Sequence, residues 1–154
     1  MKTRTVVTSL AVLIAGSALC FAEDANMGTW KLNEAKSKIG AGGPKNHTVA
    51  YTAEGDKVKV TVDGTDGEGK PAHSEWTGLF DGKDYPVTGD PSSDARSYKR
   101  INAHTLAFAG TKAGKVTVSG RVVVSSDGKS RTVTTTSTDA KGKKISSTAV
   151  YDKQ

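Results

Sequence analysis

Turn-forming residues divide this chain into short segments, and their spacing restricts the fold more than any other feature. Gly, Asp and Pro gather where a chain must reverse, because they tolerate positive φ, hydrogen-bond their own backbone or fix a turn conformation. Such clusters stand at 54–56, 66–69, 81–83, 89–91, 113–114 and 127–128. After residue 22 no segment repeats its apolar residues with a helical period, and only residues 33–39 are compatible with a single helical turn. We therefore predict an all-β protein.

Apolar and polar residues alternate within these segments. In Lys57–Val62 three valines share one face, and the valines at 116, 118, 122 and 124 alternate with polar residues or glycine in the same way. A period of two indicates strands with one face in the core and the other in water. We predict ten strands, at 28–33, 47–53, 57–63, 71–80, 84–88, 95–101, 105–110, 115–125, 130–138 and 144–152.

The connections between the predicted strands are too short for crossovers, so neighbours in sequence are expected to pair as antiparallel hairpins. A long meander tends to curl and close, since closure removes the exposed edges of the sheet. We predict an antiparallel meander β-barrel of about 8–10 strands. The alternative is a two-sheet β-sandwich, which usually needs longer Greek-key connections.

The first 22 residues have the pattern of an export signal. Lys2 and Arg4 precede an apolar run from Val6 to Leu19, and a small-residue cleavage site ends at Ala22. This order predicts a signal peptide at 1–22 and one domain at 23–154, located in the periplasm or secreted. The apolar run is shorter than the ~20 residues that span a membrane. Membrane contact is therefore expected only during export.

Cys20 is the only cysteine, so cleavage after Ala22 would leave a mature chain without disulfides. The alternative is lipidation of Cys20, but Leu19 stands where lipoprotein signals carry a small residue, and Ser17 where they carry a leucine. Loss of Lys2 and Arg4 would reduce the 22 basic residues to 20 against 16 acidic ones, and the net charge from +6 to +4. This small excess is interspersed with acids, so we expect no nucleic-acid partner and a monomer.

Three segments of the mature chain resemble a known family. They are G-T-W-K-L-N at 28–33, D-G-K-D-Y-P-V-T-G at 81–89 and V-Y-D-K at 150–153. The first contains the G-x-W pattern of lipocalins, and all three together resemble small exported bacterial lipocalin-like proteins with calycin-type barrels. The resemblance implies a barrel whose closed end is plugged by Trp30. Because such proteins mostly have no assigned function, it informs the fold rather than the activity.

The resemblance also implies a partner for Trp30. Lipocalins pack an arginine of the last strand across this tryptophan, but the last predicted strand contains no arginine here. Lys144 or Lys153 would have to take its place, although neither has the planar group that stacks on a ring.

The interior of the barrel is the expected place for a ligand. The alternation predicts an inward face made of Val49, Tyr51, Val58, Val60, Val62, Trp76, Phe80, Tyr85, Val87, Leu106, Phe108, Val116, Val118, Val122 and Val124. Small residues occupy other positions on the same inward face and would leave room for a ligand of modest size. The alternative is a barrel that flattens and packs itself shut.

Arg96, Tyr98 and Arg100 share one face of a predicted strand. An arginine and a tyrosine two residues apart can jointly grip a carboxylate, and lipid-binding barrels hold fatty-acid head groups with a similar pair. If this face points outward, it is instead a solvated basic surface. The predicted ligand-binding residues are Trp76, Phe80, Tyr85, Arg96, Tyr98 and Phe108, with the rings supplying apolar contact.

We predict no catalytic residue, metal or cofactor. His47, His73 and His104 lack the spacing of a metal site, and the serines lack a Gly-x-Ser-x-Gly elbow. The expected function is that of an exported, non-enzymatic protein that holds a small apolar or amphipathic anionic ligand in a β-barrel. The alternative is an envelope interaction module without an internal ligand. Its basic residues, Lys57, Lys59, Arg96, Lys99, Arg100 and Arg121, would contact anionic polymers or a partner protein.

Overall fold

The computed structural model describes residues 24–139 and 141–154. The predicted signal peptide at 1–22 and Cys20 lie outside the described residues. The elements are β1 (Gly28–Leu32), the 3-10 helix η1 (Glu34–Lys36), β2 (Lys45–Glu54), β3 (Lys57–Thr65), β4 (Pro71–Gly78), β5 (Tyr85–Thr88), β6 (Ala95–Asn102), β7 (Thr105–Lys112), β8 (Lys115–Val124), β9 (Ser130–Thr138) and β10 (Lys144–Lys153). Across these two ranges, no helix is both long and apolar enough to cross a membrane.

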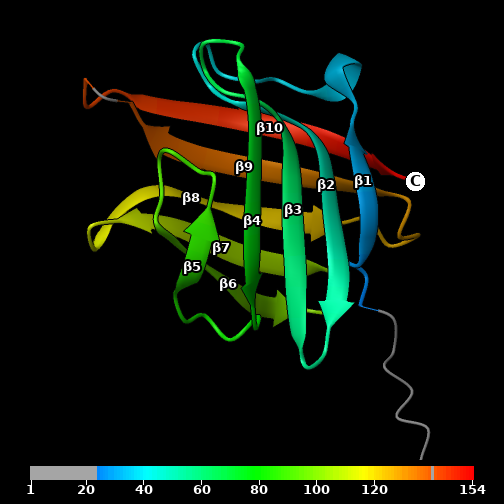
Figure 1. Ribbon diagram of the computed structural model, residues 1–154. Coiled ribbons are helices and arrows are strands. Elements are labelled where there is room, and N and C mark those ends of the chain that lie inside the picture. The colour runs from blue at the N-terminus through cyan, green and yellow to red at the C-terminus, as the bar shows by residue number, and fades with distance from the viewer. Residues whose placement is uncertain (1–23, 140) are drawn as a thin grey trace, which may run out of the picture.

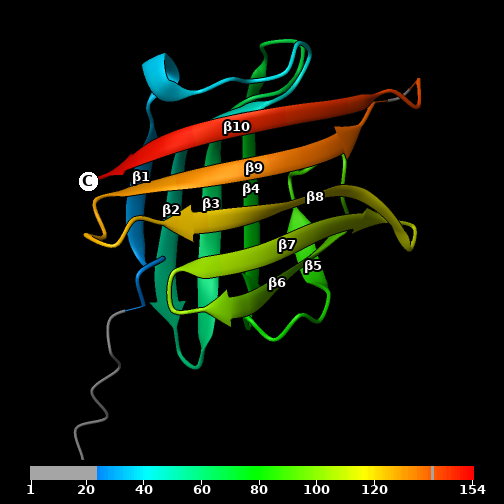
Figure 2. The same ribbon diagram turned by 180° about the vertical axis from the view of Figure 1, so that it is seen from behind.

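The ten strands form a closed antiparallel barrel. Each strand pairs with the next in sequence, and β1 pairs with β10 to complete the ring, with Trp30 opposite Lys153 and Leu32 opposite Tyr151. Figure 1 shows β2, β3 and β4 standing upright in front of β7 to β10, which run across behind them. Figure 2 shows the same crossing of the two walls from behind. The predicted meander barrel is confirmed, and the sandwich is not the fold.

The observed strands correspond one to one with the predicted ones and differ only at their ends. The single helical turn allowed at 33–39 is η1, which Asn33 caps by accepting a hydrogen bond from the Lys36 backbone N–H over 3.2 Å. Asparagine is favoured there because its side-chain oxygen satisfies a backbone donor that the helix leaves free.

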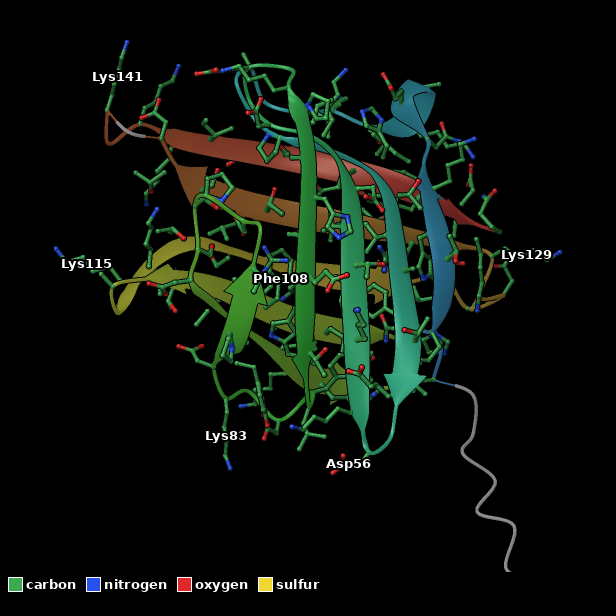
Figure 3. The ribbon with its side chains drawn as sticks, in the orientation of Figure 1. Asp56, Lys83, Phe108, Lys115, Lys129 and Lys141 are labelled. Carbon is green, nitrogen blue, oxygen red and sulfur yellow. The ribbon has the colours of Figure 1, made fainter. Side chains whose placement is uncertain are left out.

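The core fills one end of the barrel. Trp30 and Leu106 are fully buried, and Trp76 is 2% exposed. The indole Nε1–H of Trp30 donates to the backbone oxygen of Asn26 over 2.9 Å, so the segment before β1 closes this end. Figure 3 shows Phe108 between the two walls, whereas the labelled charged side chains, such as Asp56 and Lys141, extend from the turns.

Val116 is an error in the predicted inward face, since its side chain is 64% exposed. The β7–β8 pairing shifts between Gly110 and Thr111, where Gly110 lies opposite Val118 but Thr111 lies opposite Val116. The bulge adds one residue to β8 and reverses the alternation beyond it. Thr117 consequently shares the inner surface with Val118, and Val116 faces solvent.

We expect Trp30→Ala to lower the free energy of unfolding by about 3–5 kcal/mol, the usual cost of truncating a buried aromatic residue. The variant loses the ring that fills the closed end and the indole hydrogen bond to Asn26. Urea unfolding followed by tyrosine and tryptophan fluorescence measures the change. Val116→Thr, which keeps the β-branched shape at an exposed position, should stay within about 0.5 kcal/mol of the parent. Similar costs for both variants would contradict the placement of Trp30 in the core.

Candidate functional site

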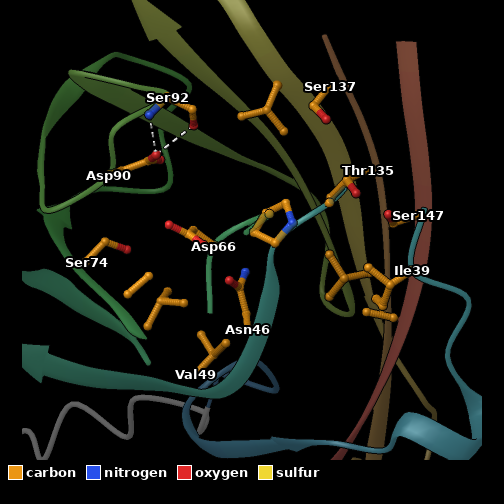
Figure 4. Close-up of a pocket in the computed structure, with 18 of the residues that line it drawn as sticks. Ile39, Asn46, Val49, Asp66, Ser74, Asp90, Ser92, Thr135, Ser137 and Ser147 are labelled. Carbon is orange, nitrogen blue, oxygen red and sulfur yellow. Dashed lines mark hydrogen bonds between the residues drawn. The ribbon is translucent and has the colours of Figure 1, made fainter. Parts of the chain in front are cut away.

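A cavity of about 340 Å³ lies between the two walls of the barrel. Its lining extends from exposed loop residues such as Gly42 and Pro91 to buried residues such as Tyr51 and Arg131. The cavity therefore opens between the loops at one end of the barrel and ends on the core at the other. In Figure 4, Thr135, Ser137 and Ser147 project into it from the β9–β10 side, with Ser74, Asp90 and Ser92 on the side facing them.

The inward residues of β9 and β10 change in character along the cavity. Tyr151 lies opposite Arg131 in the register, Ala149 opposite Val133, and Ser147 opposite Thr135. All six of these residues line the cavity. The wall thus passes from a charged and aromatic floor, through an apolar band, to hydroxyl groups nearer the mouth.

Arg96 and Tyr98 both line the cavity, so this face of β6 points inward. Tyr98 is 5% exposed, and its ring centroid lies 5.9 Å from that of Phe108, which also lines the cavity. Arg100, further along the same strand, is 40% exposed, forms an ion pair with Asp24 and lies over the Phe80 ring. The structure therefore brings Arg96, Tyr98 and Phe108 together at the cavity. Arg100 lies outside the cavity lining, beside Asp24.

The other three predicted ligand-binding residues lie in or against the core at the closed end of the barrel, outside the cavity lining. Trp76, Phe80 and Tyr85 are not among the residues that line the cavity. They instead form one aromatic cluster with Tyr98, since the Trp76 centroid lies 4.8 Å from that of Tyr98, 5.8 Å from that of Tyr85 and 6.3 Å from that of Phe80. The indole Nε1–H of Trp76 donates to the backbone oxygen of Arg96 over 2.8 Å. This cluster supports the wall and holds the backbone of β6 in place.

Arg96 is already paired with an acid. Its Nη2 donates to Oδ2 of Asp90 over 2.6 Å, and the two side chains are 14% and 12% exposed. Burial lowers the pKa of Arg96, but its interactions with the Tyr98 phenol and the Asp90 carboxylate outweigh this effect and raise the pKa above its ordinary value, so the guanidinium stays charged. Asp90 also accepts hydrogen bonds from the backbone N–H and hydroxyl of Ser92. The pair therefore ties the β5–β6 loop to the inner wall.

Arg131 is a cavity residue that the sequence did not single out. It is 2% exposed, and its Cζ lies 4.8 Å from the ring centroid of Trp30 and 4.9 Å from those of Tyr51 and Tyr151. The partner of Trp30 thus comes from β9 rather than from the last strand. Lys153 takes part from a greater distance, with its Nζ 5.4 Å from the Trp30 ring, whereas Lys144 is exposed.

Burial raises the pKa values of the two tyrosines beside Arg131. The shift is largest for Tyr51, and the pKa of Tyr151 rises to about 12. Both phenols therefore stay protonated at neutral pH and remain hydrogen-bond donors.

The carboxylates at the mouth hold turns together. Asp66 accepts from the backbone N–H groups of Glu68 and Lys70 over 2.9 Å, and Asp139 accepts from those of Lys141 and Lys143 over 2.9 and 2.8 Å. The two turns share the sequence T-D-x-x-G-K and the same hydrogen bonds. Their aspartates are therefore committed to backbone structure.

His73 lies at the rim between two acids. Its Nδ1 is 2.6 Å from Oδ1 of Asp63, and its Nε2 is 3.5 Å from Oε1 of Glu75. The hydrogen bond with Asp63, followed by that with Glu75, raises the pKa of His73. No group of three or more His, Cys, Asp or Glu side chains within residues 24–139 and 141–154 has a geometry that could hold a metal ion.

We expect Asp90→Asn to lower the free energy of unfolding by about 1.5–3 kcal/mol, the range for hydrogen bonds to charged groups. An asparagine can still accept the turn hydrogen bonds but cannot neutralise Arg96. Asp66→Asn is the matched control, because Asp66 also holds a turn at the mouth but makes no ion pair among the described residues. Its effect should stay within about 0.5 kcal/mol. Equal costs in urea unfolding would show that the pair with Arg96 contributes nothing.

Comparison with known proteins supports the fold alone. No protein-family model matches the chain, and no curated protein matches it either. Among solved structures, the chain is similar to EF1p2_mFAP2b bound to DFHBI, with a TM-score of 0.51, 11% identity, and coverage of 84% of this chain and 94% of that one. A second solved structure, a redesigned β-barrel, is 15% identical to this chain and has a TM-score of 0.48. The alignment covers 90% of this chain and 99% of that one. The likeness to EF1p2_mFAP2b agrees with the observed fold, a closed antiparallel barrel.

Proposed function

We propose that this chain is an exported, non-enzymatic binding protein that holds a small amphipathic molecule inside its barrel. The observation that carries the proposal is the cavity of about 340 Å³, which lies inside the fold and has both apolar and polar walls. Ligand sites in proteins are typically cavities of about 300–1,000 Å³ with a few polar groups on mostly apolar walls. The volume here is near the lower limit of that range and suits a small ligand.

The distribution of side chains suits an amphipathic ligand. Val49, Val62 and Val122 come from β2, β3 and β8 and supply apolar contact. Thr135 of β9 and Ser147 of β10 supply hydroxyl groups, and Arg96 and Arg131 supply positive charge. A ligand with an apolar body and at least one polar or anionic group matches this lining. The solved barrel EF1p2_mFAP2b, which shares the fold, was bound to the small molecule DFHBI.

Binding accounts for the cavity better than catalysis does. General acid–base chemistry requires a titratable side chain that is free to exchange a proton with the substrate. The titratable side chains of the cavity are engaged elsewhere, since Asp66 and Asp139 hold turns and Asp90 pairs with Arg96. His73, at the rim, is hydrogen-bonded to Asp63 and Glu75. The alternative of an external basic surface is weakened because Arg96 faces inward, and because Lys59 and Arg100 form ion pairs with Glu75 and Asp24.

The cavity is tested with the neutral fluorescent probe N-phenyl-1-naphthylamine. We expect the parent to bind one molecule, and Thr135→Phe to reduce binding at least tenfold, because Thr135 lines the cavity and a phenyl ring would occupy it. Ser146→Phe places the same ring on an exposed position of β10 and should change the Kd less than twofold. Native mass spectrometry of protein from its own host, together with a thermal-shift lipid panel, seeks the natural ligand. Equal probe binding by both variants, or none by the parent, would contradict an internal site.

Export is tested by the mass of the protein recovered from the periplasm or medium of a bacterial host. We expect a chain that begins at Glu23, because small residues precede the predicted cleavage site. Ala22→Leu should block processing and retain the full chain. A product that begins at a lipid-modified Cys20 would support the lipoprotein alternative instead. A full-length protein left in the cytoplasm would contradict export altogether.

A further inference from the structure

Arg131 is a buried charge without a counter-charge. No acidic side chain in the described part of the chain forms an ion pair with it, and its Nε and Nη1 atoms are buried without a hydrogen-bond partner there. Buried charges in proteins are normally paired, because transfer of an unpaired ion out of water is costly. Three aromatic rings surround the guanidinium. Their π faces offset part of the cost but accept no conventional hydrogen bonds from its edge.

Arg96, the other arginine of the cavity, has an acidic partner of the kind that Arg131 lacks among the described residues. Arg96 lines the same cavity, and its Nη2 pairs with Asp90 at 2.6 Å, although its Nε, like that of Arg131, is buried without a hydrogen-bond partner among the described residues. Of the two cavity arginines, only Arg131 on the floor has no carboxylate partner among the described residues, since Asp90 pairs with Arg96. The other cavity carboxylates, Asp66 and Asp139, lie in turns at the mouth. A negative group that enters the cavity would therefore gain more at Arg131 than at Arg96, where it would have to compete with a carboxylate already in place.

The neighbours of Arg131 complete an anion-binding environment. Tyr51 and Tyr151 line the cavity on either side of it and are 3% exposed. Their phenols stay protonated at neutral pH because burial raises their pKa values. An arginine fork together with tyrosine hydroxyls offers several donors to one anionic group, and a water-poor site strengthens each bond.

We propose that Arg131 is the anion receptor of the barrel, and that the ligand is a small monoanionic amphiphile that enters with its carboxylate or sulfonate toward the floor. This inference rests on the proposed function, because it assigns the charge and the orientation of the molecule held in that cavity. The apolar body of the ligand would then lie along Val133 and Ala149, above the floor. Any polar substituent would face Thr135 and Ser147 nearer the mouth.

The test uses two probes that differ by one charged group. 8-Anilinonaphthalene-1-sulfonate has the ring system of N-phenyl-1-naphthylamine with an added sulfonate, so their affinity ratio isolates the contribution of the anion. We expect the parent to bind the sulfonate probe at least tenfold more tightly than the neutral one. Arg131→Met, which keeps much of the side-chain volume, should remove this preference and bring the affinity ratio of the two probes close to one.

Matched variants separate the floor from the rest of the molecule. Arg121→Met removes the same charge from an exposed position of β8 and should leave the affinity ratio unchanged. Thr135→Phe should reduce binding of both probes, which places them inside the barrel. If Arg131→Met does not fold, the affinity ratio of the two probes on the parent still tests whether the cavity prefers an anion. A second test on the parent compares decanoate with decanol as competitors of the sulfonate probe. Decanoate should displace the sulfonate probe at a concentration at least tenfold lower than decanol does.

The outcomes distinguish the two proposals. If the parent binds both probes equally, or if Arg121→Met and Arg131→Met lower the ratio alike, Arg131 is not the anion receptor, although the cavity remains a binding site. If the parent binds neither probe, the proposed function itself fails. A preference for the sulfonate probe that survives Thr135→Phe would place the anion outside the barrel and overturn the inference.

Discussion

The contact between Trp30 and Arg131 is the interaction on which the rest of this barrel depends. Trp30 lies on the first strand and Arg131 on the ninth, so their contact spans the seam where β1 and β10 close the ring. Closure satisfies the backbone groups that an open sheet would leave at its edges. The same contact fills one end of the barrel, and the cavity can only begin above it.

The distribution of side-chain size explains why one end is solid and the other hollow. Large rings gather at the closed end, where Trp76 packs against Phe80, Tyr85 and Tyr98, and Tyr51 meets Phe80 and Tyr98 edge to face. Toward the mouth, β4, β9 and β10 contribute Ala, Ser and Thr to the lining. A wall of small side chains cannot reach across a barrel of this size, so space remains.

The two buried arginines divide structural and binding roles. Arg96 contributes to the integrity of the β5–β6 loop through Asp90, and this pair satisfies its charge. Arg131 lies at the base of the cavity, and its buried Nε and Nη1 have no hydrogen-bond partner among the described residues, which costs stability in the empty protein. In folded proteins, buried polar groups without hydrogen-bond partners often lie at functional sites, because a bound ligand can provide the missing partner.

The sequence by itself determined the strand order and the antiparallel meander, because the two-residue period and the turn residues are local properties. It placed Arg96 and Tyr98 on one face of a strand but left open whether that face points inward, which the closed barrel decided. Val116 was placed on the wrong face since a bulge at Thr117 arises from pairing with β7, which no single strand encodes. Arg131 is two residues from Val133 and so shares its face of the strand, which was the only indication in the sequence that Arg131 points inward. Tertiary structure alone decided that it meets Trp30 and Tyr51, since these rings come from β1 and β2, which approach β9 only when the ring closes, whereas Tyr151 lies opposite Arg131 in the β9–β10 hairpin.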